Sequence, residues 1–114
     1  MEKFNSLKKT TDFGRVYHQG KSHGNGVLVM YIVERGQGQV GRIGISVSKK
    51  IGNSVVRHRQ KRRIRECFRT HLNGWKDGFD IIVVARQSIV KSDYLSLLDA
   101  LESAGKHLNI FDNE

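Results

Sequence analysis

SKKIGNSVVRHRQKRRIRECFR, residues 48–69, holds nine of the chain's twenty Lys and Arg residues and a single acid, Glu66. Nine positive charges minus one give +8, which is nearly the whole formal net charge of +9. The segment also decides the fold, because its apolar residues recur at helical spacing. On a helix they fall within an arc of about 120°: Val56, Ile64, Cys67 and Phe68. We predict a helix from residue 54 to about residue 71 that packs this face on a sheet.

The cations occupy the other side of the same predicted helix. An arc of about 100° carries His58, Lys61, Arg62, Arg65 and Arg69. A stripe at i, i+4 spacing follows one edge: Arg57, Lys61 and Arg65. Like charges at this spacing destabilise a helix by about 0.2–0.5 kcal/mol per pair. The arrangement therefore favours a polyanionic partner over a merely solvated face, which would normally mix the two signs.

The start of this helix adds a second cationic feature. Lys49 and Lys50 precede Gly52-Asn53-Ser54, which is typical of a helix N-cap. Free backbone N–H groups at a helix N-terminus attract phosphate, and flanking lysines strengthen that attraction. The combination indicates an RNA-binding segment.

Composition limits the class of protein. A chain of 114 residues with 38% hydrophobic residues predicts one folded domain spanning 1–114. A pI near 10.1 favours nucleic acid or an anionic membrane as partner. The narrow apolar face of the basic helix and the absence of a long apolar run argue against a membrane. The single Cys67 fits a reducing compartment, so we expect a cytoplasmic protein.

Hydrophobic periodicity and turn residues predict the other elements. Thr10 or Thr11 caps a first helix that Gly20 ends, and Ser92 caps the last helix. Asn73 and Gly74 end the basic helix. The elements expected, in order, are a helix over 10–19, a turn at 24–26, strands over 27–33 and 40–48, the basic helix, a doubly buried strand over 79–86 and a helix after 92. The order is thus helix, two or three strands, helix, strand and helix, which predicts an α+β sandwich of one sheet and packed helices.

Three aromatic residues allow two interpretations. Phe13 and Tyr17 are four residues apart on the first predicted helix, and Tyr31 lies in the first predicted strand. Rings beside a cationic groove can stack on single-stranded RNA bases. Plain core packing is the alternative, and for an isolated Phe/Tyr pair it is the better one.

Catalytic chemistry is not evident in the sequence. Five scattered histidines and one cysteine do not make a zinc site, and no phosphate-binding loop or nucleophile motif occurs. Asp77 and Asp80 are close in sequence but have no evident positioned partner, so an acid–base pair is unsupported. Protein-bound metal sites are left undefined. The chain is predicted to bind rather than to catalyse.

Residues 44–69, GISVSKKIGNSVVRHRQKRRIRECFR, closely resemble the protein subunit of bacterial ribonuclease P. LKKTTDFGRVYHQGKS at residues 7–22 and FDIIVVAR at residues 79–86 are similar to that family's opening segment and its late buried strand. The resemblance implies a single αβββαβα sandwich like the second domain of ribosomal protein S5. It also implies a left-handed β-α-β crossover, where the general rule predicts a right-handed one.

The resemblance implies a function as well. In this family an RNA subunit is the catalyst, and the protein assists the Mg²⁺-dependent endonucleolytic removal of the 5′ leader from precursor tRNA. The partners implied are ribonuclease P RNA and precursor tRNA, with Mg²⁺ needed mainly by the RNA and no small-molecule substrate. The family signature falls on Arg57, His58, Arg59, Lys61, Arg62 and Arg65. Together with Lys49, Lys50 and Arg69 from the charge pattern, these are the RNA-binding residues that we expect. The leader cleft implied consists of Phe13, Tyr17, Tyr31, Ser46, Lys50, Arg57, Lys61 and Arg65.

The resemblance thus favours leader contact over core packing as the interpretation of the three aromatic residues. One departure concerns His58, which stands where the family usually has Asn. An Asn amide both donates and accepts hydrogen bonds, whereas imidazole is bulkier and can carry charge. Two other hypotheses stay open: a structural RNA-binding protein without a processing role, and a DNA-binding module that uses the basic helix in a major groove.

Overall fold

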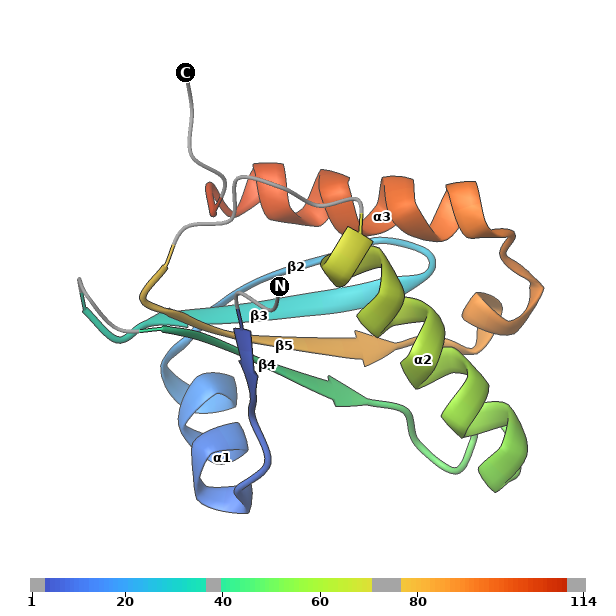
Figure 1. Cartoon of the computed structure of the whole chain (residues 1–114), viewed down its shortest axis with the longest axis horizontal. Coiled ribbons are helices and arrows are strands. Elements are labelled where there is room, and N and C mark those ends of the chain that lie inside the picture. The colour runs from blue at the N-terminus through green and yellow to red at the C-terminus, as the bar shows by residue number, and fades with distance from the viewer. Residues whose placement is uncertain (1–3, 37–39, 71–76, 111–114) are drawn as a thin grey trace.

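A five-stranded sheet in the order β1-β4-β5-β3-β2 forms the centre of the protein (Figure 1). The computed structural model describes residues 4–36, 40–70 and 77–110. Its strands are β1 (Phe4–Ser6), β2 (Lys21–Gly24), β3 (Leu28–Glu34), β4 (Gly41–Ser46) and β5 (Phe79–Ala85). Its helices are α1 (Thr10–Gln19), α2 (Ser54–Thr70), the 3-10 helix η1 (Gln87–Lys91) and α3 (Tyr94–His107).

β5 is the central strand of the sheet. It runs parallel to β4 and antiparallel to β3. Ile81, Ile82 and Val83 on this strand are buried, because helices cover both faces of the sheet. The prediction of a strand buried on both sides is confirmed.

Two apolar layers pack on the two faces of the sheet. Alternate residues of β3, β4 and β5 face α2 and α3, and this layer includes Met30, Ile64 and Leu101. The opposite face carries a smaller cluster of Leu7, Val16 and Ile82 beneath α1. Phe13 and Tyr31 pack against this smaller cluster, so the aromatic residues of the predicted leader cleft belong to the α1 face.

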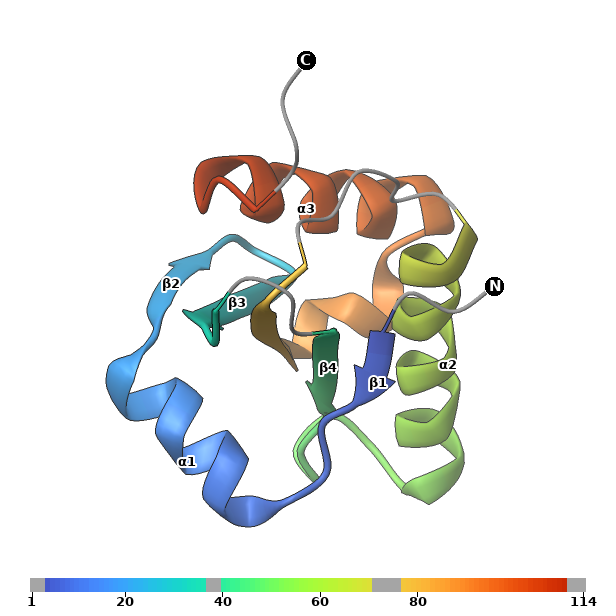
Figure 2. The same ribbon diagram turned by 60° about the vertical axis from the view of Figure 1, so that its left-hand side comes forward.

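The chain passes from β4 through α2 into the adjacent parallel strand β5. The apolar side of α2 packs in the same layer as α3, so the connection crosses that face of the sheet. Followed through Figures 1 and 2, this path gives the crossover the left hand that the family resemblance implies. It is an exception to the right-handed rule for such connections.

Several predicted boundaries differ from the structure. The edge strand β1 and η1 are not among the predicted elements. β2, for which no residue range was predicted, supplies the third strand of the αβββαβα order that the resemblance implies. Lys9, rather than a threonine, occupies the N-cap position of α1 and makes no side-chain cap bond. Asp93, rather than Ser92, caps α3 by accepting a hydrogen bond from the Ser96 backbone N–H. The predicted helix stop at residues 73 and 74 lies outside the described residues.

The end of α1 agrees with its prediction. The Gly20 stop is confirmed, since the Gly20 backbone N–H bonds to the Val16 carbonyl at 2.8 Å. Among the described helices, none combines the length and the apolar character that crossing a membrane would need.

Candidate nucleic-acid interface

The loop between β4 and α2 is held in place from both sides. The Asn53 side-chain oxygen accepts a hydrogen bond from the Val56 backbone N–H at 3.0 Å, which confirms the predicted N-cap. The Arg57 guanidinium donates back to the Gly52 carbonyl at 3.2 Å. The Gln87 side chain donates to the backbone carbonyl of Lys50 at 3.2 Å and so ties the loop to η1. The start of α2 is therefore presented on a fixed backbone.

The inner face of α2 is anchored by apolar residues and by one arginine. Ile64, Cys67 and Phe68 are buried as predicted, together with Gln60. Arg63 donates to the Gln60 side chain at 2.7 Å, and it also bonds the backbone carbonyls of residues 89 and 92. Arg63 thus fixes α2 on η1 and the segment that follows it.

Apart from Arg63, the cations of the basic segment lie on the outer face of α2 and in the loop before it. Arg57 and Lys61 are half-buried. The other predicted RNA contacts are exposed: Lys49, Lys50, His58, Arg59, Arg62, Arg65 and Arg69. Glu66 lies among them and pairs with Arg69 at 2.7 Å. The result is a surface of almost one sign, as the sequence pattern predicts.

A second group of predicted site residues gathers on the opposite face of the sheet, beside α1. The Tyr17 and Tyr31 rings meet edge to face with their centroids 5.0 Å apart, and the Phe13 and Tyr17 ring centroids are 6.2 Å apart. Burial raises the pKa of the Tyr17 hydroxyl, against a smaller lowering by its hydrogen bond with Ser46. Tyr17 is nevertheless 40% exposed, so this cluster borders solvent.

The strand register explains why these residues meet. Ser46 lies two positions beyond Gly44 on β4, and both face α1 because Ile43 and Ile45 face the other layer. Tyr31 lies in the same cross-strand row as Gly44, with β5 between them. The Phe13 ring lies directly on Gly44, where an added side chain would leave no room for it. The structure therefore brings together four of the predicted cleft residues: Phe13, Tyr17, Tyr31 and Ser46.

The other members of the predicted cleft come from α2 and its loop. Residues 47–53, which include Lys50, connect the end of β4 to the first turn of α2, where Arg57 lies. Lys61 and Arg65 follow one and two turns later, on a helix that lies beyond the β1–β4 edge of the sheet (Figure 2). The structure thus places the aromatic cluster beside α1 and the cationic stripe on a separate helix.

Sequence reasoning missed a charge cluster around one buried acid, which we name the Asp80 cluster: Asp12, Arg15, Arg35, Arg42 and Asp80. The expectation that Asp80 lacks a positioned partner is wrong. Arg42 donates to both carboxylate oxygens, at 2.9 and 2.7 Å, and Arg15 donates to one of them. Arg35 lies 3.6 Å from the same carboxylate. An acid within the apolar run 79–85 was the one signal in the sequence.

The Asp80 carboxylate is held charged by these arginines. Burial alone would raise the pKa of Asp80, but hydrogen bonds from Arg42 and Arg15 outweigh it and hold the pKa below its usual value. A carboxylate whose oxygens are occupied in this way is an ion-pair partner rather than a general base. Across residues 4–36, 40–70 and 77–110, no three His, Cys, Asp or Glu side chains gather as a metal site would require.

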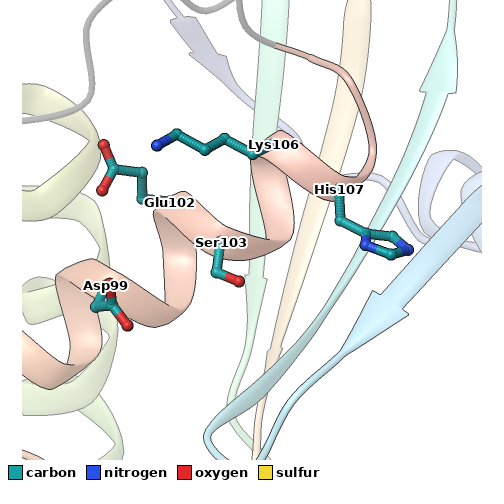
Figure 3. Close-up of a pocket in the computed structure, with 5 residues that line it drawn as sticks. All are labelled: Asp99, Glu102, Ser103, Lys106 and His107. Atoms are coloured by element: carbon teal, nitrogen blue, oxygen red, sulfur yellow. The ribbon is translucent and has the colours of Figure 1, made fainter.

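A hollow of about 480 Å³ lies on α3 (Figure 3). It is lined by Asp99, Glu102, Ser103, Lys106 and His107. The His107 ring also stacks on His23 of β2, with centroids 3.7 Å apart. Both signs of charge line this hollow, and none of the predicted RNA contacts does. It is therefore separate from the cationic surface.

Known proteins resemble this chain over nearly its whole length. The family described as Ribonuclease P matches residues 1–109. The chain belongs to the ribonuclease P family. Among curated ribonuclease P protein components, that of Caldanaerobacter subterraneus subsp. tengcongensis is 42% identical, covering 99% of this chain and 97% of the relative. The component from Lachnoclostridium phytofermentans is 46% identical, covering 89% and 86% of the two chains.

Solved ribonuclease P proteins share the fold. The Staphylococcus aureus protein has a TM-score of 0.84 and 39% identity, covering 94% of this chain and 97% of its own. The Thermotoga maritima protein has a TM-score of 0.79 and 27% identity, covering 96% and 99%. The α+β architecture inferred from the sequence is thus that of ribonuclease P proteins, and membership supports a role in the ribonuclease P complex and in tRNA processing.

Proposed function

We propose that this chain is the protein component of ribonuclease P and that it acts by binding two RNAs. The outer face of α2 binds the catalytic RNA subunit, and the cluster beside α1 binds the 5′ leader of precursor tRNA. The observation that carries the proposal is the exposed, almost single-signed face of α2, whose apolar side is buried. The catalyst in this proposal is the RNA, and no protein side chain is assigned a catalytic role.

The cations act by reducing repulsion between two polyanions. A protein that neutralises phosphates releases their counterions, so its binding weakens as salt rises. Because Mg²⁺ also screens phosphate repulsion, the benefit of the protein is largest at low Mg²⁺ concentration. Mg²⁺ takes oxygen ligands such as carboxylates and phosphates, and the α2 surface offers almost none. The proposal therefore places the required Mg²⁺ on the RNA.

The leader is single-stranded, so its bases are free to stack on aromatic rings. Phe13, Tyr17 and Tyr31 supply the rings, and Ser46 lies at their edge. The cationic side of this cleft is assigned to Lys50, Arg57, Lys61 and Arg65. We expect the protein to act in the cytoplasm.

The decisive experiment adds the protein to a ribonuclease P RNA and precursor tRNA at low Mg²⁺ concentration. We expect faster release of the 5′ leader, with a gain that shrinks as KCl is raised. A variant with Arg62→Gln and Arg65→Gln should lose most of the gain. Lys106→Gln together with Lys91→Gln removes the same charge outside the α2 surface and should keep it. No gain in 5′ cleavage with the unaltered protein would refute the proposal.

The two rival functions give different results in simple binding assays. A structural RNA-binding protein would bind precursor tRNA and mature tRNA equally in the presence of the RNA subunit. A DNA-binding module would be displaced from RNA by duplex DNA at comparable concentration. The proposed function predicts a preference for the leader-bearing tRNA and weak competition by duplex DNA.

A further inference from the structure

The Asp80 cluster joins α1 to the strands of the sheet. Asp12 and Arg15 come from α1, Arg42 from β4 and Asp80 from the start of β5. Arg42 is the direct cross-strand partner of Asp80, so these two are fixed by the sheet itself. Arg42 also reaches the Asp12 carboxylate at 3.3 Å. The helix therefore contributes one carboxylate and one guanidinium to a network whose other members are held in position by the sheet.

α1 has few other anchors on the sheet. Val16 is its one fully buried residue, and Phe13 rests on Gly44. Arg15 lies between Phe13 and Tyr17 in the sequence of the helix, and its guanidinium is tied to Asp80 on β5. The contact between Arg15 and the Asp80 carboxylate adds a charged anchor to these apolar ones.

We infer that Asp80 is a positioning residue for leader recognition, which holds α1 so that Phe13 and Tyr17 face the leader. The inference rests on the proposed function, because it assumes that these rings contact the leader. Asp80 is completely buried, so it acts only through the arginines that surround it. The α2 cations do not depend on Asp80 for their position, since α2 is anchored by its own apolar residues in the core layer on the opposite face of the sheet.

The charge of Asp80 matters more than its shape. Without it, three guanidinium groups would lose the carboxylate that they share, and Arg15 and Arg42 would both rely on the Asp12 carboxylate. Arg42 is held on a strand and Arg35 directly follows one, whereas Arg15 is carried by a helix that can shift. Mutual repulsion then moves α1 away from the sheet. An Asp80→Asn substitution, which keeps the shape and removes the charge, isolates this effect.

The test uses the holoenzyme reconstituted with ribonuclease P RNA. The affinity of the holoenzyme is measured for precursor tRNA with a leader and for mature tRNA. The affinity of the protein for the RNA subunit is measured separately. Asp80→Asn should weaken binding of the leader-bearing substrate about tenfold, the equivalent of losing one stacked base. Binding of mature tRNA and of the RNA subunit should stay within about twofold of the unaltered protein, since α2 is unaffected. Asp77→Asn makes the same charge change at an exposed position nearby in the sequence and should leave all three affinities unchanged.

A second variant separates positioning from folding. Arg15→Gln leaves Asp80 paired with Arg42 and frees only the helix, so it should reproduce the selective loss with an intact sheet. Equal losses for all three ligands in both variants would show a merely structural role and overturn the inference. Unchanged leader preference in a folded Asp80→Asn or Arg15→Gln protein would overturn it too. If the unaltered protein itself shows no leader preference, the proposed function fails instead.

Discussion

Adding one methyl group at Gly44 should displace the Phe13 ring. A Cβ atom built on Gly44 would lie 2.6 Å from Cζ and 3.0 Å from Cε1 of Phe13, and 3.3 Å from Cβ of Leu7. Carbon atoms that are not bonded normally stay at about 3.5 Å or more. The ring must therefore retreat by about 0.9 Å, the difference between 3.5 and 2.6 Å.

The expected cost to stability is moderate, because the ring is half-buried and has room to move outward. Overpacking of this kind costs about 1–2 kcal/mol of unfolding free energy. In a Phe13→Ala background the clash with the ring is gone, and the remaining contact with Leu7 needs only a small adjustment. There, Gly44→Ala should cost less than about 0.5 kcal/mol, since alanine also limits the freedom of the unfolded chain.

The assay is urea unfolding followed by far-ultraviolet circular dichroism, applied to the four proteins of the Gly44/Phe13 double-mutant cycle. Gly14→Ala is the matched control. Gly14 lies inside α1 with nothing within 4 Å of its added Cβ, so the same change should stabilise the protein by about 0.5–1 kcal/mol. The reasoning is refuted if Gly44→Ala is as stable as the unaltered protein, or if its cost is the same with and without Phe13.

Three further predictions concern charge. Arg65→Gln should reduce the magnitude of the slope of log affinity for RNA against log salt by just under one. Arg63→Gln should leave that slope unchanged. It should instead cost about 1–3 kcal/mol of unfolding free energy, because the Gln60 side chain and the carbonyl groups of residues 89 and 92 lose their hydrogen-bond donor. The pKa of Asp80 is lowered in the folded state, so its contribution to stability is present above the usual carboxylate pKa of about 4 and is lost as pH falls through the lowered folded-state pKa. Asp80→Asn should therefore be destabilised at pH 7, and the difference should shrink in acid unfolding experiments below about pH 4. His58→Asn, which restores the residue usual in the family, should keep or improve cleavage at pH 8; a large loss would show that His58 has a role of its own.

The helical period was enough to predict both faces of α2. Ile64, Cys67 and Phe68 of the predicted apolar arc are buried and Val56 is half-buried, whereas most of the cations are exposed. Arg63 borders the apolar arc, and its partners lie 26 and 29 residues away in η1 and just after it. Such distant carbonyl groups leave no local pattern, so sequence alone could not separate Arg63 from its neighbours.

The strand β1, the residue range of β2 and the Asp80 cluster escaped prediction for related reasons. β1 and β2 have three and four residues, and β2 consists of KSHG, so neither shows the apolar alternation that predicts a strand. The partners of Asp80 lie 65 and 38 residues away in the sequence, at Arg15 and Arg42. Only the pairing of β4 with β5 brings Arg42 to it. The aromatic residues meet because of the same strand pairing, and only the family resemblance predicted that they form one site.

The central place of β5 also constrains how the chain can fold. β3 and β4 are made before β5, yet each pairs with β5 and not with the other. Until residues 79–85 are available, both strands keep an unpaired inner edge, and α2 has no finished sheet to pack on. Contacts between segments so far apart in sequence form slowly, since loop closure must precede them. A nascent chain that ends at residue 70 would thus carry the whole basic segment before β5 exists to complete the sheet beneath α2. During that part of synthesis the polycationic segment is exposed without its final fold and must avoid binding the wrong RNA.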